Sequence, residues 1–230
     1  MKPNYIIAIL LLIALSNNLT AQKEFVGFDT GFGTYEMTHT KHILESAMKT
    51  NVLQPQPVSN FPGYLFLRPY FGIEYQYFNV GIAYTLMSTG SRYSIHDYSG
   101  EYKFDTQIVG NAFGLFAEIP IYSINRIKLL IAAESGIILN TMKLDESIQI
   151  TGISHQQNDD NLTSTNVFIK PYLKAAYEIR KDIGVNFLIG YHKDIIANRM
   201  HLQSDILSVT DFSADWDGIR TSIGISYRFD

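Results

Sequence analysis

The segment 166–179, NVFIKPYLKAAYEI, alternates polar and apolar side chains with a period of two residues. Its charged members, Lys170, Lys174 and Glu178, all share one parity. The other parity is apolar and holds Val167, Ile169, Leu173, Ala175, Tyr177 and Ile179. Because successive side chains of a strand point to opposite faces, the segment predicts a β-strand with one charged and one apolar face.

Seven further segments show the same alternation. In chain order the eight predicted strands are Glu24–Tyr35, Arg68–Phe78, Asn79–Thr89, Thr106–Tyr122, Arg126–Asn140, Asn166–Ile179, Gly184–Lys193 and Gly218–Phe229. Every second connection is short, and the others are long and polar: Glu36–Leu67, Gly90–Asp105, Thr141–Thr165 and Asp194–Asp217. This rhythm predicts an all-β fold, an eight-stranded antiparallel up-and-down transmembrane β-barrel with short periplasmic turns and long extracellular loops.

Glycine indicates which face of these strands is the interior. The strand glycines lie on the charged parity of their own segments: Gly27, Gly31, Gly33, Gly72, Gly81, Gly110, Gly114, Gly136, Gly184, Gly190 and Gly224. The interior of an eight-stranded barrel is only just wide enough to be filled by side chains, so long charged side chains fit there only beside very small neighbours. The charged face is therefore expected to line the lumen and the apolar face to meet lipid.

This assignment places a balanced set of charges in the lumen. The acids are Asp29, Glu74, Glu118, Glu134 and Glu178, and the bases are Lys128, Lys170, Lys174, Arg220 and Arg228. Buried charges persist only when they are paired and hydrogen-bonded, so we expect an ion-pair network along the barrel axis. A plugged and rigid interior is favoured over a gated pore, because eight strands leave little free bore.

Composition agrees with a membrane setting. The 230 residues include 18 Lys+Arg and 22 Asp+Glu, and this formal charge of −4 argues against a nucleic-acid-binding protein. The absence of cysteine excludes disulfide scaffolds, thiolate metal sites and cysteine nucleophiles. Charged residues make up 17% of the chain, against about 25% in soluble domains. Much of the surface is thus expected to face something other than water.

The first residues have the pattern of an export signal. Lys2 precedes the apolar run Ile6–Leu15, and a small residue, Ala21, stands before the next polar stretch. The run is half the length of a membrane-spanning helix, so it predicts a secretory signal peptide over residues 1–21, with cleavage after Ala21. Residues 22–230 are then the barrel domain. Within its first long loop, Lys41–Thr50 shows helical spacing of its apolar residues.

The last strand resembles a known assembly signal. Its residues Ser222, Gly224, Tyr227 and Phe229 place a polar residue, a glycine and two aromatics in a spacing similar to that of the eight-stranded outer-membrane β-barrels of Gram-negative bacteria, the OmpA-like and PorT-like group. The resemblance implies location in the outer membrane, contact with its lipid, and recognition of this strand by the barrel-assembly machinery. Asp230 is a departure, because many members end on the aromatic residue itself.

The function expected from these observations is structural or interactive, with the outer loops serving adhesion, surface recognition or envelope assembly through protein partners or surface ligands. No catalytic, cofactor or metal site is predicted. One alternative is a small enzyme at the rim that acts on lipid or peptide, for which His192, inward on the seventh segment, is the candidate. Another is a soluble periplasmic barrel that carries a hydrophobic ligand.

Overall fold

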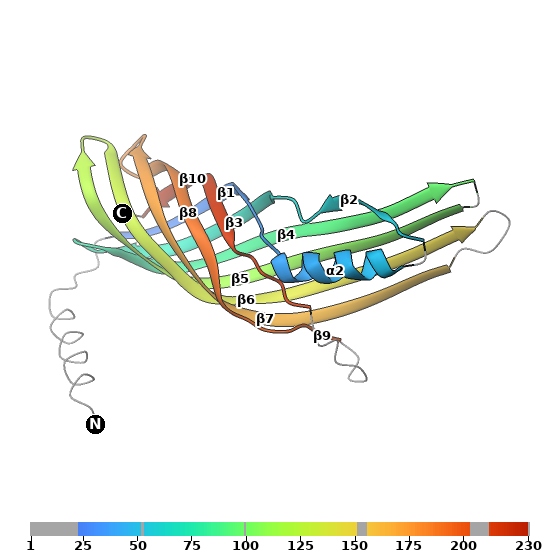
Figure 1. Cartoon of the computed structure of the whole chain (residues 1–230). Coiled ribbons are helices and arrows are strands. Elements are labelled where there is room, and N and C mark those ends of the chain that lie inside the picture. The colour runs from blue at the N-terminus through green and yellow to red at the C-terminus, as the bar shows by residue number, and fades with distance from the viewer. Residues whose placement is uncertain (1–22, 52, 99, 151–155, 203–211, 230) are drawn as a thin grey trace, which may run out of the picture.

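A computed structural model describes residues 23–51, 53–98, 100–150, 156–202 and 212–229 (Figure 1). The predicted signal peptide lies outside these residues. The elements are β1 (Lys23–Gly33), α2 (Thr38–Thr50), β2 (Gln56–Asn60), β3 (Tyr64–Glu74), β4 (Asn79–Asp97), β5 (Gly100–Ile124), β6 (Ile127–Ile150), β7 (Gln156–Glu178), β8 (Ile183–Ala197), β9 (His201–Leu202) and β10 (Gly218–Arg228).

Eight of these strands close into a ring. The sheet runs in the order β4, β3, β1, β10, β8, β7, β6, β5, and pairing of β4 with β5 completes the circle. Every pairing is antiparallel, and β2 and β9 are short additions on β4 and β7. A closed antiparallel ring leaves no free sheet edge along the barrel, which is the predicted up-and-down topology.

Each of the eight predicted segments overlaps one strand of this ring. The short connections also lie where they were expected, in the β3–β4, β5–β6 and β7–β8 turns. We call this the turn end of the barrel and the opposite end the long-loop end.

Two of the four long polar connections were wrongly predicted as loops. Most of 90–105 and 141–165 is strand, because β4 pairs with β5 as far as Asp97↔Gly100 and β6 pairs with β7 as far as Ile148↔Gln156. The polar residues there still alternate, and the inward parity is covered by α2 rather than by the rest of the ring. The polar residues of these two segments were interpreted as loops. They are instead typical of a β-sheet that lies outside the membrane.

The four strands β4–β7 therefore continue well past the ring, and Figure 1 shows them as a curved sheet with α2 lying against it. We call this part the extension. The helix buries Leu44 and Met48 against inward residues of the sheet, among them Tyr93 and Met142. At its end, Asn51 Nδ2 donates to Tyr102 Oη (3.4 Å). The predicted helical segment is thus present, and packing on the extension supplies the stability that an isolated helix of this length lacks.

The outward side chains of the ring form an apolar belt. Leu115, Ile223 and Phe187 expose 69%, 58% and 52% of their surface, whereas Lys170 and Lys174 expose 4% and 6%. Such a surface around a charged interior is stable in hydrocarbon, where a closed ring also satisfies the backbone hydrogen bonds. The chain is a transmembrane β-barrel of the outer-membrane type.

No helix in the described part of the chain has both the length and the apolar character needed to cross a bilayer.

Candidate functional site

The centre of the lumen is organised around Arg68 of β3. Its Nη1 lies 2.7 Å from Asp29 Oδ2, and its Nη2 lies 2.9 Å from Glu134 Oε2. Glu134 Oε2 also receives Lys170 Nζ at 2.8 Å. All four side chains are at most 5% exposed. Two bases and two acids therefore neutralise one another across strands β1, β3, β6 and β7.

A second layer lies closer to the turn end. Lys174 Nζ contacts both oxygens of Glu118, at 2.9 and 3.1 Å. Tyr172 Oη donates to Glu118 Oε1 (3.0 Å), and Asn79 Nδ2 donates to Oε2 (3.2 Å). Every lone-pair region of this buried carboxylate faces a donor, so its charge is compensated by more than one group.

Aromatic rings pack among these charges. Phe25, Tyr70 and Phe116 pack at centroid distances of 6.0–6.3 Å. The Arg68 guanidinium lies 4.9 Å from the Tyr70 centroid, and Lys174 Nζ lies 5.2 Å from it. The bore is thus filled by side chains at mid-height.

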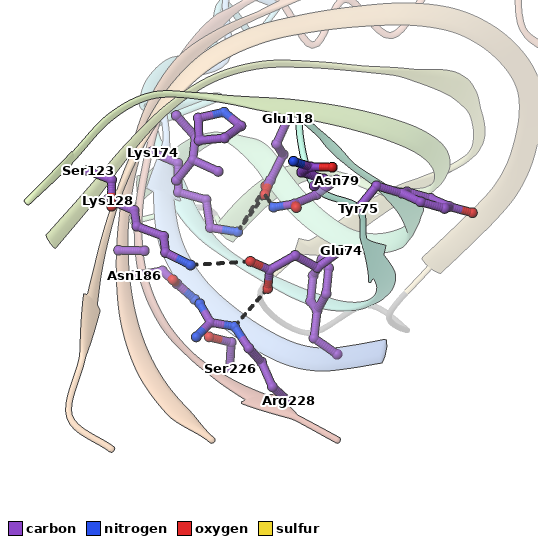
Figure 2. A pocket seen from close by; sticks show the side chains of 15 residues that line it. Glu74, Tyr75, Asn79, Glu118, Ser123, Lys128, Lys174, Asn186, Ser226 and Arg228 are labelled. Atoms are coloured by element: carbon purple, nitrogen blue, oxygen red, sulfur yellow. Dashed lines mark hydrogen bonds and ion pairs between the residues drawn. The ribbon is translucent and has the colours of Figure 1, made fainter. Parts of the chain in front are cut away.

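At the turn end the lumen opens into a cavity of about 240 Å³ (Figure 2). Four charges stand at its rim in alternating order. Lys128 Nζ lies 3.2 Å from both Glu74 and Glu178, and Arg228 contacts Glu74 at 3.0 Å and Glu178 at 2.6 Å. Their side chains are 16–28% exposed. The cavity is therefore polar and charge-balanced, and it ends against the Lys174–Glu118 pair.

At the long-loop end the residues just before β10 close the lumen. Trp216 is fully buried and forms an edge-to-face contact with Tyr35 (5.0 Å). Its Nε1 donates to Asn140 Oδ1 (2.7 Å), and its backbone N–H donates to Asp194 Oδ2 (3.1 Å). Arg220 donates to the Trp216 carbonyl. Trp216 thus closes the long-loop end of the lumen above the charged side chains.

Three carboxylates lie close together beside Trp216. Asp194, Asp215 and Asp217 bring their oxygens within 4.8 Å of one another. Both Asp194 oxygens already accept hydrogen bonds, Oδ2 from Asn166 and Oδ1 from His192. Asp217 accepts from Lys193 and from the Asp194 N–H. Burial and the neighbouring Asp217 charge raise the pKa of Asp215 to about 6. The chain's own donors saturate the two buried members, so the cluster ties the closing segment to β8.

The structure places all ten predicted charges of the lumen on the inward parity. Nine of them form ion pairs within the lumen, namely Asp29, Glu74, Glu118, Glu134, Glu178, Lys128, Lys170, Lys174 and Arg228. Arg220 differs, because within the described residues it donates to backbone carbonyls, including that of Thr34, and forms no ion pair.

Sequence reasoning missed Arg68, the centre of the network. The predicted strand began at Arg68, so the residue was treated as a boundary, although it shares the parity of Glu74. Extending the alternation towards Tyr64, where β3 begins, would have found it.

The four residues of the proposed assembly signal lie on both faces of β10 and the chain that follows it. Ser222 is buried, and Gly224 pairs with Asp29, where a Cβ would stand 2.0 Å from the carboxylate Oδ1. Tyr227 and Phe229 point outward, 44% and 42% exposed, with ring centroids 5.2 Å apart. The aromatic pair therefore sits on the membrane face at the turn end.

No family model matches this chain, and no curated protein matches it. Among solved structures it is similar to the Neisserial surface protein A NspA (10% identity, 92% of this chain and 99% of that one, TM-score 0.44). It is also similar to Ail, the attachment invasion locus protein of Yersinia pestis (10%, 90% and 97%, TM-score 0.37). The outer membrane protease OmpT of Escherichia coli is a third (11%, 92% and 98%, TM-score 0.39). All three TM-scores lie below 0.5, so the functions of these proteins do not transfer to this chain.

Proposed function

We propose that this protein is a bacterial outer-membrane barrel in which the ring is a closed anchor and the extension is the working part, a surface for recognition of envelope or surface partners. The OmpA-like and PorT-like resemblance of the sequence belongs to this proposal. The apolar membrane belt, the filled lumen and the long extension support it.

One observation carries the proposal. Strands β5, β6 and β7 have 25, 24 and 23 residues, whereas β1, β3 and β10 have 11 each. A transmembrane strand needs about 9–11 residues, so the short strands β1, β3 and β10 are already long enough to cross the membrane. The surplus in the long strands corresponds to about 40 Å of additional sheet at ~3.3 Å per residue. A barrel that only anchors or seals has no use for that sheet.

The lumen supports a closed anchor rather than a pore. The Arg68 layer and the aromatic rings fill the bore at mid-height, and Trp216 covers the long-loop end. We therefore expect no steady ion conductance from the purified protein in planar bilayers. Stable channels with step-like openings would contradict this part of the proposal.

The decisive experiment shortens the extension while leaving the ring intact. Ser91 pairs with Thr106 in the β4–β5 register, so an Asn-Gly turn can replace 92–105. We expect the shortened protein to assemble in the outer membrane with heat-modifiable gel mobility, and to lose the partners that detergent-solubilised wild-type protein retains in affinity capture. The matched control is Lys128→Met at the turn end, which should keep them.

Retention of every captured partner by the shortened protein would refute a role for the extension. Recovery of the wild-type protein in osmotic-shock fluid without detergent would instead favour the soluble, ligand-carrying alternative.

The geometry gives the rim-enzyme alternative no support. His192 is 3% exposed, its ring stacks on Phe168 at 4.7 Å, and its Nε2 is engaged with Asp194. A general base must reach its substrate, and this imidazole is enclosed beneath the closing segment.

Recognition of the last strand by the barrel-assembly machinery is also proposed. The exposed aromatic pair Tyr227 and Phe229 stands at the turn end, the side that faces the periplasm if the long strands lie outside the cell. A periplasm-facing aromatic pair at the end of a strand is accessible to such a machinery before insertion.

A further inference from the structure

The pairing between β3 and β4, which we call the β3–β4 seam, is interrupted twice. At mid-height the register contains no pair for Arg68 or Pro69, and proline has no N–H to donate to the ladder. Towards the long-loop end, pairing of β4 with β3 stops at Met87, and pairing with β2 begins at Ser91. The β-ladder along the seam therefore has two gaps. At the second, the Phe61 N–H donates to the Gly90 carbonyl oxygen (2.9 Å) and Thr89 Oγ1 donates to the Pro62 carbonyl oxygen (2.9 Å).

An apolar groove of about 790 Å³ lies at the first gap, on the outer surface of the wall. Its floor is low where the small outward residue Ser135 stands between larger apolar side chains. The outward side chains of Phe71, Ile82, Phe113, Leu115 and Ile137 line it. The groove lies within the exposed apolar belt, so the molecule that fills it must be hydrocarbon.

A polar groove of about 470 Å³ lies at the second gap, directly beyond the belt. Ser59, Ser88 and Gln107 line it. The ring of Tyr64, 55% exposed, stands at its side. The groove thus offers hydroxyl groups and an aromatic face.

The charged side chains of the polar groove limit the kind of head group that it can bind. Arg92 forms a two-pronged pair with Asp105, at 2.6 and 2.7 Å. Asp145 lies directly opposite Asp105 on the neighbouring strand and also lines the groove. The groove therefore carries one more acid than base, which disfavours a phosphate. Carboxylates and a guanidinium together suit a head group rich in hydroxyls, which both donate and accept.

The two grooves follow the same strands at a short separation. Tyr84 lines the apolar groove and Ser88 the polar one, four residues apart on β4, or about 13 Å. At the apolar groove Tyr84 Oη donates to Asn111 Oδ1 (2.5 Å) on the outward face, and the apolar side chain of Leu86, 37% exposed, lies between the two grooves. We propose that the β3–β4 seam binds one amphiphile, with an acyl chain in the apolar groove and an uncharged, hydroxyl-rich head in the polar one. This goes beyond the role proposed for the extension.

Two probes with the same chain and different heads test the proposal. The full-length protein in tetraethylene glycol monooctyl ether is titrated with dodecyl maltoside or with dodecyl phosphate, and bound molecules are counted by native mass spectrometry. We expect one maltoside per barrel and binding of the phosphate weaker by about tenfold or more, the effect of losing one charge-assisted interaction. Equal binding of the two probes would overturn the assignment of the head group.

Two variants test the position. Ser135→Phe fills the apolar groove, and the double variant Arg92→Ala/Asp105→Ala removes the ion pair from the polar groove, where Asp145 is the charge that remains. Each should weaken maltoside binding by about tenfold. The control is Thr221→Phe, which adds the same ring at a small, outward residue of β10, and should bind as the wild type does.

Because the double variant alters only exposed groups, it remains informative if Ser135→Phe fails to show heat-modifiable mobility. Wild-type affinity in the double variant, or in a folded Ser135→Phe protein, would overturn the site. So would an equal loss in the Thr221→Phe control.

Discussion

Arg68 lies between two carboxylates at the centre of the barrel, and its side chain is 1% exposed. Replacing it with methionine removes one cation, so that Glu134 keeps Lys170 and Asp29 loses its ion-pair partner. Breaking a buried ion pair typically costs about 3–5 kcal/mol, because the remaining charge has no water to solvate it. We expect Arg68→Met to lower the free energy of unfolding by that amount in urea titrations followed by gel mobility.

The exposed pair Arg92–Asp105 is the matched control for this prediction. Its Arg92 side chain is 53% exposed, and exposed pairs contribute about 0–1 kcal/mol. Arg92→Met should therefore change stability little. If Arg68→Met were equally mild, the network would not be a stabilising core.

The inward glycines differ in the space around them, and this gives a second prediction. A Cβ on Gly136 would stand 1.9 Å from the Phe113 carbonyl oxygen, a backbone atom that cannot move aside. A Cβ on Gly184 would first meet the Ser226 hydroxyl at 3.0 Å. We expect Gly136→Ala to destabilise the barrel by about 1–3 kcal/mol, and Gly184→Ala to be tolerated, in the same unfolding assay. Equal effects would show that the wall yields at both positions.

Asp215 gives a prediction about pH. Its pKa in the folded protein is raised from 3.8 to about 6, so the folded state binds the proton more tightly than the unfolded state does. The stability linked to this group is fully present below about pH 3.8 and is lost as the pH rises through about 6. Asp215→Asn should remove that part of the pH dependence and stabilise the protein at pH 7 by about 1 kcal/mol, since a half-exposed carboxylate is partly screened by water.

Unfolding curves at pH 4 and pH 7 measure this effect. Lys181→Gln, in the turn between β7 and β8, is a control that changes net charge without touching the closing segment. An Asp215→Asn protein that kept the wild-type difference between the two pH values would contradict the prediction.

At the scale of elements, the extension depends on α2. Leu44 is 1% exposed and packs in the cluster that contains Met48, Tyr93 and Met142. Leu44→Ala should lose about 2–4 kcal/mol of packing. That loss should spare β1 and β10, because neither strand contributes a residue to this cluster as described. Hydrogen exchange should accelerate in α2 and in the outer parts of β4–β7, and remain unchanged in β1 and β10.

The exposed His42 on the same helix provides the control, since His42→Ala removes a side chain that is not part of the cluster. Faster exchange in β1 after Leu44→Ala would mean that the ring and the extension unfold as one unit.

The last strand also acts as an element. Phe229 is 42% exposed, and its ring contacts only Tyr227 among the aromatic residues described. Phe229→Ala should therefore change the stability of the folded barrel little. If the strand is an assembly signal, however, the same change should slow insertion into liposomes that contain the assembly machinery. Ile223→Ala, on the membrane face of the same strand, should insert at the wild-type rate.

For the whole molecule, one partition explains most of the structure: charge lies inside, apolar side chains lie outside, and polar sheet continues beyond the membrane. A barrel of this kind is expected to migrate faster on a gel when folded than after boiling, and to require detergent for extraction. Its bore should be closed to ions, because the Arg68 layer and Trp216 fill it at two levels.

Alternation of side chains in the sequence was sufficient to predict the ring and, apart from Arg68, the main charges that line it. A strand has only two faces. Once the interior face is assigned, the sequence positions of Lys174 and Arg228 determine the face to which each side chain points. Glycine on the same parity made that assignment, because a narrow lumen needs small residues beside long ones.

Only the tertiary structure decided which charges meet. The partners of Arg68 come from β1 and β6, 39 and 66 residues away, and parity says nothing about the height of one strand against another. Trp216 is buried over the lumen, because the segment before β10 turns inward and places its indole N–H on Asn140. The extension could likewise not be predicted from the sequence, because its inner face is covered by a helix rather than by other strands.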